Sequence, residues 1–512
     1  MRKLSKIIFS INFLYIVLIA AQIAAIIFLC LTLPSVMPLA LTFMFIWIFN
    51  GITACVLFSR RGAPEVKCAW FVLITALPVA GALIYLFASV KKKPCGVLKV
   101  EKNNEKTPKT NQNCDNSSKN SLLYSLAAAA ENTCGTALAG YDRAEYFSGG
   151  TEFFNAVCRE IECAKKCVYV EFFIVGRGKI FNSFMTAVQK ARENGAEVKL
   201  IIDGVGTAFR ISRKELKRLK SSGIRVKIFH RLTPFPRARL NFRDHRKIVT
   251  VDGRVAFTGG FNLADEYANI TSPYGYWKDT GVAVFGAAAK IFEGMFLSVW
   301  GCSCTDGGGN LCKNDGKALK KRKKHRDFTI KLPLNGEFEC LPFYDSPPHR
   351  AFFEDAFIYA VNNAKKRVYI TTPYLCGSAK VLSALEFAAK RNVDVKIIIP
   401  HIPDKKYAFG LSKAYAREIS LSGTGIFEFT PGFMHAKCVI CDDIAFLGSY
   451  NLDYRSTHFN FECGAAFGGK ICEAALRDFE ESLALSKPFK DDKILPHTRF
   501  LRFVLRLFAP LM

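Results

Sequence analysis

The sequence carries one short pattern twice, as HRKIVTVDG at residues 245–253 and as HAKCVICDD at residues 435–443. In both copies a histidine is followed two positions later by a lysine, and an aspartate comes five positions after the lysine. A turn containing glycine and asparagine follows in each copy, GGFN at 259–262 and GSYN at 448–451. Architectural duplication alone does not require polar residues to recur at matched places. The repeat therefore indicates that both copies contribute to one function.

The segments before the two copies share one order of expected elements, helix, strand, helix and strand. Apolar runs rich in Val and Ile that alternate with amphipathic helices are typical of parallel sheets covered by helices. We therefore predict an α/β fold made of two tandem units that pack about a pseudo-twofold axis. The expected elements are 153–166, 167–175, 181–195 and 196–203 in the first unit, and 352–366, 367–375, 380–392 and 393–400 in the second.

The amino-acid composition limits which classes of protein and which binding partners are possible. Apolar residues make up 50% of the 512 residues and charged residues 22%, which suits a chain with a sizeable core. The net charge of +27 indicates an anionic partner, either nucleic acid, anionic lipid or a phosphorylated substrate. The predicted divisions are a membrane anchor at 1–93, a polar linker at 94–120, a first α/β domain at 121–302, a linker at 303–327, a second α/β domain at 328–486 and a basic amphipathic tail at 487–512.

Three apolar segments lie near the N-terminus, at 7–33, 37–58 and 68–90. Each exceeds the roughly 20 apolar residues that cross a bilayer, and repeated spans do not fit a cleaved signal peptide. Basic clusters at 2–6, 60–67 and 91–93 all favour the cytoplasmic side. Two spans, with a third segment that enters and returns at Pro78, put all three clusters on that side, whereas three full spans leave one outside. We favour the former.

The repeated residues are expected to form a single site. In a strand, residues two apart point to the same face, so each histidine projects together with its lysine. Packing about a pseudo-twofold axis then brings the two copies together. The predicted site contains His245, Lys247, Asn262, His435, Lys437 and Asn451.

Such a site suits the transfer of a phosphodiester. One imidazole attacks phosphorus, and the other protonates the departing alkoxide. The lysines and asparagines donate hydrogen bonds to the non-bridging oxygens. Asp279 and Glu462, at corresponding places in the later strands, are predicted to orient the histidines. Asp252 and Asp442, at the strand ends, are better placed to hold a turn. No carboxylate cluster lies near the motifs, so neither a metal nor another cofactor is predicted.

These residues resemble the paired H-x-K-x4-D motifs of the phospholipase D superfamily, and the surrounding sequence is similar to that of bacterial cardiolipin synthases. The resemblance implies two tandem phospholipase D-like units preceded by transmembrane helices, in a multi-pass protein of the bacterial cell membrane with its catalytic domains facing the cytoplasm. The similar stretches are 243–267, TTPYL at 371–375, PGFMHAKCVICDD at 431–443 and GSYNLDYRSTHFNFE at 448–462.

The resemblance also implies roles for single residues and a reaction. Two phosphatidylglycerols are joined into cardiolipin, with release of glycerol, through a phosphatidyl-histidine intermediate. By analogy His245 is the nucleophile and His435 the acid and base. One departure from the family pattern is Gly281, which stands where a histidine is expected. The residues with implied catalytic roles are His245, Lys247, Asp252, His435, Lys437 and Asp442.

Some alternatives stay open. The expected partners are phosphatidylglycerol and anionic membrane lipid, with no nucleic acid, and the oligomeric state is left open. The same site serves a membrane-bound phospholipase D or another phosphatidyltransferase with a different acceptor. The tail, with Arg499, Arg502 and Arg506 at helical spacing, is either an interfacial helix or a helix docked on the protein. The basic run 317–327 either lies against anionic headgroups or is a solvated linker.

Overall fold

The computed structural model describes residues 39–60, 62–89, 97–102, 121–208, 210–231, 241–301, 327–332, 338–347, 351–490 and 503–511, together with positions 20, 24, 27, 28 and 32. These residues divide into two compact units. The large unit comprises Pro94–Arg231 and Phe242–Arg502, and the N-terminal unit comprises Met1–Lys93, Leu232–Asn241 and Phe503–Met512. The basic run 317–327, apart from Asp327, and Arg499 and Arg502 of the tail lie outside the described residues.

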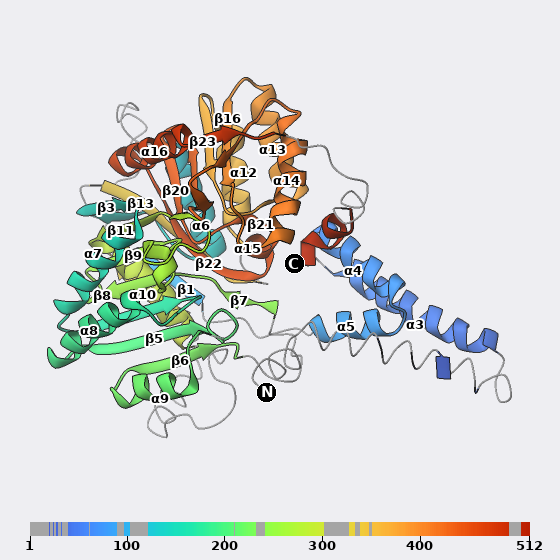
Figure 1. Ribbon diagram of the computed structural model, residues 1–512, viewed down its shortest axis with the longest axis horizontal. Coiled ribbons are helices and arrows are strands. Elements are labelled where there is room, and N and C mark those ends of the chain that lie inside the picture. The colour runs from blue at the N-terminus through green and yellow to red at the C-terminus, as the bar shows by residue number, and fades with distance from the viewer. Residues whose placement is uncertain are drawn as a thin grey trace. The chain divides into compact units, whose positions relative to one another are not determined.

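The first repeat is built on a seven-stranded sheet (Figure 1). Helices α7 (Gly150–Glu162) and α8 (Lys179–Glu193) cover one face, because their apolar residues recur every three or four positions and join a single core. Helix α10 (Ala287–Trp300) packs on the sheet, and α9 (Arg213–Ser221) packs beside strand β6. The strands, in spatial order, are β3 (Arg143–Phe147), β11 (Gly281–Phe285), β9 (Val255–Gly259), β8 (Ile248–Val251), β4 (Cys167–Phe172), β5 (Glu197–Asp203) and β6 (Arg225–Phe229).

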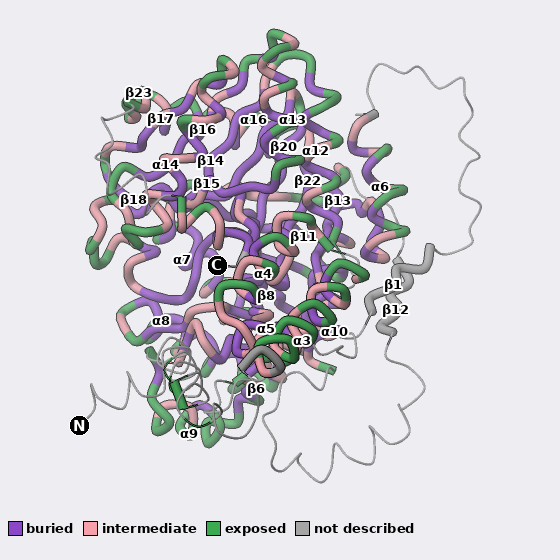
Figure 2. Tube along the Cα trace, turned by 90° about the vertical axis from the view of Figure 1, so that its right-hand side faces the viewer, coloured by how far each residue is buried: buried purple, intermediate pink, exposed green. Residues whose placement is uncertain are grey.

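The second repeat has a larger sheet of the same design. Its helices are α12 (Phe353–Asn363), α13 (Ala379–Lys390), α14 (Lys406–Ser420), α15 (Tyr454–His458) and α16 (Gly469–Ala484). In Figure 2 the strands coincide with buried segments of the chain. In spatial order the strands are β2 (Ala139–Tyr141), β13 (Phe338–Asp345), β22 (Asn460–Phe467), β20 (Ile444–Gly448), β19 (Cys438–Cys441), β14 (Arg367–Thr371), β16 (Asp394–Pro400), β17 (Gly425–Phe429) and β23 (Ser486–Pro488).

The prediction of parallel sheets holds for β4 with β5 and for β14 with β16, the strands on which it was based, but it is wrong for the larger part of each sheet. Strands β4, β5 and β6 are parallel, but β4–β8, β8–β9, β9–β11 and β11–β3 are antiparallel pairs. The reason is the tight turn that follows each His-x-Lys strand. Asp252 and Gly253 adopt φ values of 57° and 64°, and Asp442 adopts 51°, so the chain reverses directly into the next strand.

The two repeats are interlocked through strands that they exchange. Strand β2, from the start of the predicted first domain, pairs with β13 of the second repeat, and helix α6 (Ser121–Cys134) packs against the same strand. The segment predicted as the first linker supplies β1 (Val97–Lys102), which pairs in parallel with β12 (Asp327–Leu332) at the start of the predicted second domain. Two further short pairs join the repeats at the predicted site, β7 (Arg243–Asp244) with β22 and β10 (Tyr276–Lys278) with β18 (Gly432–Met434).

The N-terminal unit contains a long apolar helix and two shorter ones. Helix α3 (Leu39–Ser59) includes the one segment among the described residues that is long and apolar enough to cross a membrane, Thr42–Ser59. Helices α4 (Pro64–Ala76) and α5 (Ala80–Ala88) have 13 and 9 residues. They are therefore about 20 Å and about 14 Å long, less than the roughly 30 Å of a bilayer core. Most of the predicted segment 7–33 lies outside the described residues.

The chain reverses between α4 and α5, as predicted at Pro78. The rings of Trp70 and Tyr85 lie 5.5 Å apart, and a Cβ on Gly81 would lie 2.3 Å from the carbonyl oxygen of Leu73. At the tip, the backbone N–H of Val79 donates to Oδ1 of Asn50 at 3.2 Å, near the middle of α3. The short helices therefore form a hairpin that reaches halfway along the long helix.

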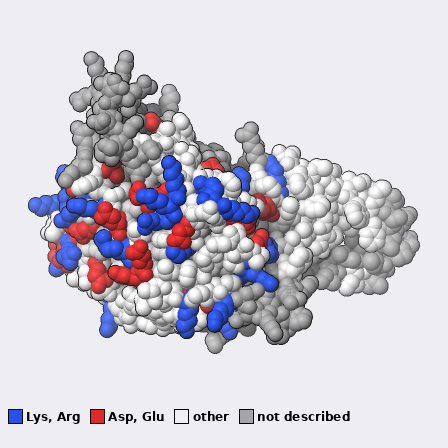
Figure 3. All heavy atoms as spheres, turned by 90° about the horizontal axis from the view of Figure 1, so that it is seen from above, with Lys and Arg blue, Asp and Glu red and all other residues white. Residues whose placement is uncertain are grey.

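The basic ends of these helices lie together. Arg60 donates to the carbonyl oxygen of Ser89 at 2.9 Å, and Lys67 donates to that of Phe58 at 3.2 Å. The C-terminal ends of α3 and α5 and the start of α4 are thus at one end of the unit. Residues 503–508 are helical, and the short helix η5 (Ala509–Leu511) that follows packs against α4. On the face seen in Figure 3, the described surface of the helices α3–α5 is free of charged side chains over most of its length.

Candidate active site

The strand pairs exchanged between the repeats place each motif histidine beside an acid of the opposite repeat. In β7–β22, Asp244 is in register with Phe461, and the backbone N–H of the next residue, His245, donates to the Phe461 carbonyl at 2.9 Å. In β10–β18, Met434 is in register with Lys278, and the His435 N–H donates to the Lys278 carbonyl at 2.7 Å. The residues that follow the register partners are Glu462 and Asp279. Two equivalent local structures thus form at the junction.

Each histidine is hydrogen-bonded to the acid that this register brings to it. Nδ1 of His245 lies 2.9 Å from both carboxylate oxygens of Glu462. Nδ1 of His435 lies 2.5 Å from Oδ2 of Asp279. A carboxylate accepts the Nδ1 proton, so Nε2 of each neutral ring carries the free lone pair. The two acids that the sequence suggested as orienting groups therefore lie against the histidines, in a crossed arrangement that the sequence did not predict.

Glu462 is held more firmly than Asp279. Besides His245 it accepts hydrogen bonds from the hydroxyl of Ser449, from the hydroxyl of Ser456 at 2.8 Å and from Nδ2 of Asn460 at 3.1 Å. Asp279 accepts from the backbone N–H of Thr280 at 2.9 Å. The three Glu462 donors escaped the sequence reasoning. All three donors lie in the stretch 448–462, which begins with the turn that follows the second motif and ends at Glu462. This closeness in sequence to the acid was the signal that could have identified them.

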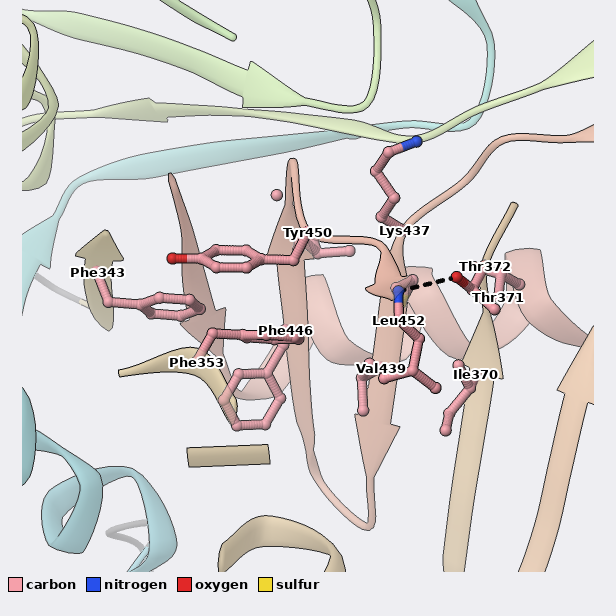
Figure 4. Close-up of a pocket in the computed structure, with 13 residues that line it drawn as sticks. Phe343, Phe353, Ile370, Thr371, Thr372, Lys437, Val439, Phe446, Tyr450 and Leu452 are labelled. Atoms are coloured by element: carbon pink, nitrogen blue, oxygen red, sulfur yellow. Dashed lines mark hydrogen bonds between the residues drawn. The ribbon is translucent and has the colours of Figure 1, made fainter. Parts of the chain in front are cut away.

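The two motif lysines are fully buried beside their histidines. Nζ of Lys247 donates to the His245 carbonyl at 2.6 Å, and Nζ of Lys437 donates to the His435 carbonyl at 2.5 Å. Figure 4 shows the Lys437 side chain running away from an apolar pocket lined by Phe343, Val439, Phe446 and Leu452. Burial is the main cause that lowers the pKa of Lys247 to about 7 and that of Lys437 to about 8. A phosphodiester bound between them favours the charged form of both.

Burial also lowers the pKa of both histidines, to about 4 for His245 and about 3 for His435. Lys437, from the other repeat, further lowers the pKa of His245, and Lys247 does the same for His435. The four side chains thus act on one another electrostatically as a single site. At neutral pH both imidazoles are uncharged, which is the form a nucleophile needs.

Burial alone would raise the pKa of each acid, but the neighbouring histidine and lysine more than offset it. The pKa of Glu462 lies below its ordinary value because of His245 and Lys247, and that of Asp279 because of His435 and Lys437. Both acids are therefore ionised at neutral pH and accept the Nδ1 protons. No group of three or more His, Cys, Asp or Glu side chains that could hold a metal occurs in the described part of the chain.

The surroundings of the two imidazoles differ. His435 lies among three aromatic rings, with ring centroids 5.4 Å away in Tyr267, 4.9 Å in Trp277 and 5.7 Å in Phe433. The ring centroid of Phe173 lies 5.0 Å from that of His245, with the two planes 67° apart. The near-symmetry of the motifs therefore does not extend to the walls of the site.

The two motif asparagines occupy different environments. The amide of Asn262 is engaged at both ends: Oδ1 accepts from the Ile174 N–H at 2.9 Å, and Nδ2 donates to the Tyr267 hydroxyl at 2.7 Å. Oδ1 of Asn451 is buried with no hydrogen-bond partner among the described residues. Asn262 thus braces the loop that carries Tyr267 beside His435, and the predicted contact of the asparagines with phosphate stays a prediction.

The motif aspartates lie away from the histidines, at the opposite ends of β8 and β19. The Asp252 carboxylate accepts the backbone N–H groups of Lys165, Lys166 and Cys167 at 2.8–2.9 Å, where β4 begins. Asp442 accepts those of residues 365–367 at 2.8–3.0 Å, where β14 begins. Each carboxylate therefore ties the hairpin turn to the start of the neighbouring strand. The catalytic role that the resemblance implies for these two residues has no contact with the histidines to support it.

Replacing Asp252 or Asp442 with alanine is expected to act on stability. Each change leaves three backbone donors without their acceptor, which costs on the order of 1–3 kcal/mol of the free energy of unfolding. Thermal unfolding of the full chain measures the loss, and kcat per folded molecule should change less than about threefold. Asp252→Asn, which keeps one acceptor oxygen, is the matched control and should lose less. A large fall in kcat at unchanged stability would contradict this assignment.

Gly281, the departure from the family pattern, has a packing reason. It lies in β11 two residues after Asp279, in register with Gly259 and Phe147. A Cβ at this position would lie 2.8 Å from the ring of Phe153 and 3.0 Å from that of Phe261. The space that a larger side chain would need is filled by the aromatic core of the first repeat.

Comparison with known proteins gives one consistent set of relatives. The family model described as "Cardiolipin synthase, PLD-like domain" matches twice, at residues 157–272 and 357–483. An uncharacterized protein of Streptococcus mutans is 36% identical over 397 residues, covering 76% of this chain and 83% of its own. A cardiolipin synthase of Clostridium perfringens is 30% identical over 481 residues, covering 88% of this chain and 95% of its own.

Among solved structures, a phosphatidylserine synthase of Haemophilus influenzae is similar in fold, with a TM-score of 0.59 and 13% sequence identity. The likeness covers 77% of this chain and all of that one. The two matches to the family model each contain one His-x-Lys motif, so the two-repeat architecture predicted from the sequence is confirmed.

Proposed function

The chain belongs to the cardiolipin synthase family of phospholipase D-like phosphatidyltransferases, and from this premise we propose that it joins two phosphatidylglycerols into cardiolipin and releases glycerol. The observation that carries the proposal is the crossed arrangement of the two histidines, each hydrogen-bonded to an ionised acid of the opposite repeat. Two imidazoles with free Nε2 lone pairs, flanked by two buried lysines, suit a two-step displacement at phosphorus.

In the first step Nε2 of His245 attacks the phosphorus of one phosphatidylglycerol. The bond between phosphorus and the bridging oxygen of the headgroup glycerol breaks, and His435 gives that oxygen a proton. His435 is neutral in the free site, so it takes up this proton together with the substrate, whose negative phosphate raises the histidine's pKa. Lys247 and Lys437 donate to the non-bridging oxygens, where charge develops in the transition state. The product is a phosphatidyl-histidine and free glycerol.

In the second step the phosphatidyl group passes to a second lipid. His435, now neutral, removes the proton from the terminal hydroxyl of another phosphatidylglycerol. The hydroxyl oxygen attacks phosphorus, the phosphorus–nitrogen bond breaks, and His245 regains its lone pair. Each step returns the groups that the other consumed, so the reaction is reversible and needs no external energy source.

The assignment of His245 as nucleophile is supported by the difference between the two acids. Glu462 accepts four hydrogen bonds, from His245, two hydroxyls and one amide, so its position and the tautomer of His245 are tightly fixed. A nucleophile gains from such a fixed lone pair. His435 must exchange its proton in both steps, and the less constrained Asp279 suits that role.

The N-terminal unit supports a membrane location. Helix α3 is long enough to span the bilayer, and the hairpin of α4 and α5 is too short to do so. We propose that the hairpin enters from the side that carries Arg60 and Lys67 and returns to it, so the large unit follows on that side. By the positive-inside rule this side is the cytoplasm. The enzyme is then a multi-pass protein of the cell membrane whose catalytic unit meets phosphatidylglycerol in the inner leaflet.

A second candidate is a phospholipase D or a phosphatidyltransferase with another acceptor, because the same site serves water or a different alcohol. The deciding experiment uses the purified full-length protein in phosphatidylglycerol liposomes with EDTA. We expect cardiolipin and glycerol in a one-to-one ratio, measured by mass spectrometry and an enzymatic glycerol assay. Phosphatidic acid in place of cardiolipin would favour the hydrolase. Dependence on an added divalent ion would contradict the mechanism.

A further inference from the structure

We propose that exposed apolar and basic side chains beside the start of strands β10 and β18, which lead into the site, form a surface that docks on an anionic phospholipid bilayer. This inference rests on the proposed function for its substrate and goes beyond it, because it assigns a membrane contact to the catalytic unit itself. We call this surface the mouth rim. It consists of Tyr276 from the first repeat, and Ile402, Lys405, Lys406 and Tyr407 from the second.

The part of the mouth rim from the second repeat is fixed next to the catalytic residues. It follows strand β16 and leads into helix α14. The hydroxyl of Tyr374 donates to Oδ2 of Asp404 at 2.6 Å, and the ring of Tyr374 lies 6.5 Å from Phe433, which packs on His435. Nζ of Lys405 lies 5.5 Å from the centre of the same tyrosine ring. The negative charge of Asp404 also acts on the pKa of Lys437.

The two repeats meet within the mouth rim. The N–H of Ile402 donates to the Gly432 carbonyl at 3.4 Å, and the N–H of Tyr276 donates to the Pro431 carbonyl at 3.0 Å. A Cβ on Gly275 would lie 3.2 Å from Cδ1 of Ile402. Strands β10 and β18, which carry these contacts, lead directly into Asp279 and His435. The mouth rim therefore borders the strand ends where the site is built.

Three apolar side chains of the mouth rim are exposed to solvent. Tyr276 is 45% exposed, Ile402 37% and Tyr407 50%. Single exposed apolar side chains are common on soluble proteins, but contiguous ones from two separate segments mark an interaction surface. Leu421, at the other end of α14, is 84% exposed and lies about 22 Å away along the helix, so it is an isolated case.

Charge identifies the bilayer as the occupant. Lys405 and Lys406 are exposed at the start of α14, and Nζ of Lys405 lies 4.0 Å from Oδ2 of Asp404, the oxygen that also accepts the Tyr374 hydroxyl. Aromatic and aliphatic side chains next to lysines are the composition of surfaces that bind the interface of anionic membranes. Docking there would bring the strand ends that lead into Asp279 and His435 close to the lipid phosphates.

The test compares two forms of the substrate with full-length protein. One is phosphatidylglycerol in liposomes, and the other is short-chain phosphatidylglycerol kept below its micelle concentration. We expect Ile402→Ser/Tyr407→Ser and Lys405→Gln/Lys406→Gln to lower kcat/KM on liposomes by about tenfold or more, at roughly fivefold per lysine. On the monomeric substrate the change should stay within about twofold. Leu421→Ser, the matched control, should change neither. Equal losses on both substrates, or no loss on liposomes, would overturn the proposal.

A second measurement does not depend on activity, so it separates this inference from the proposed function. Tyr407→Trp and Leu421→Trp are reconstituted in nanodiscs with brominated phosphatidylglycerol, and the signal of the four native tryptophans is subtracted. We expect quenching at position 407 and none at position 421. Equal quenching at both positions would overturn the mouth rim, whatever the product of the enzyme. Quenching at 407 without cardiolipin formation would uphold the rim and contradict the proposed reaction.

Discussion

Replacing His245 with alanine is expected to abolish phosphatidyl transfer, with a fall in kcat on the order of 10⁴–10⁶, because no covalent intermediate can form. His435→Ala should lose a similar factor with phosphatidylglycerol, whose alkoxide needs a proton to depart. A substrate with p-nitrophenol in place of glycerol separates the two roles, since p-nitrophenolate departs without one. We expect a stoichiometric burst of p-nitrophenolate from the wild type and from His435→Ala, and none from His245→Ala.

The same experiment has a direct readout of the intermediate. With substrate labelled at phosphorus, His435→Ala should retain the label on the protein after denaturation at alkaline pH, where phosphohistidine survives. Label on His245→Ala, together with a burst, would reverse the assignment of the two histidines. Retention of full activity in both variants would contradict the mechanism as a whole.

Glu462→Gln is expected to lower kcat on the order of 10²–10⁴ with little effect on the abundance of folded protein. A glutamine can turn its NH₂ group toward Nδ1 of His245, which then accepts a hydrogen bond instead of donating one. The Nε2 atom in that tautomer carries hydrogen and has no lone pair for phosphorus. Ser449 donates to Oε2 and Ser456 to Oε1 of the acid, so the glutamine, with one acceptor oxygen, can keep only one of these two contacts.

Asp279→Asn is the matched variant in the other half-site and should reduce kcat by a smaller factor, since fewer contacts fix its orientation. Both variants are measured with phosphatidylglycerol liposomes, and thermal unfolding reports any loss of stability. The p-nitrophenol substrate again discriminates: its burst should be slowed by Glu462→Gln and nearly unaffected by Asp279→Asn. An equal effect of the two variants on the burst would argue against different roles for the two histidines.

The sequence predicted the members of the site better than their connections. The spacing of His245 and His435 within matched segments predicted that they meet, and the repeat alignment singled out Asp279 and Glu462. It could not show that each acid serves the histidine of the other repeat, because that pairing depends on the register of β7 with β22 and of β10 with β18. Register between segments far apart in the chain leaves no local pattern in the sequence.

Other features escaped for similar reasons. Strands β8 and β9 read as short apolar runs, so their antiparallel pairing follows only from the turn at Asp252 and its positive φ. The spacing did predict a turn-holding role for Asp252, whereas the resemblance implied catalysis. Polar partners such as Ser449 and Asn460 become recognisable only when the acid that they bind is located, because serine and asparagine occur on every surface and turn.

The crossed strand pairs have a consequence for the origin and the engineering of this enzyme. A chain with one repeat would present a histidine whose acid resides in another molecule, so it could assemble a complete half-site only by pairing with a second copy of itself. The junction of β7 with β22 and of β10 with β18 therefore has the form of a homodimer interface contained within one chain. Because the two half-sites belong to one chain, each can carry residues that the other lacks, as the three aromatic rings around His435 and the two hydroxyls that bind Glu462 show.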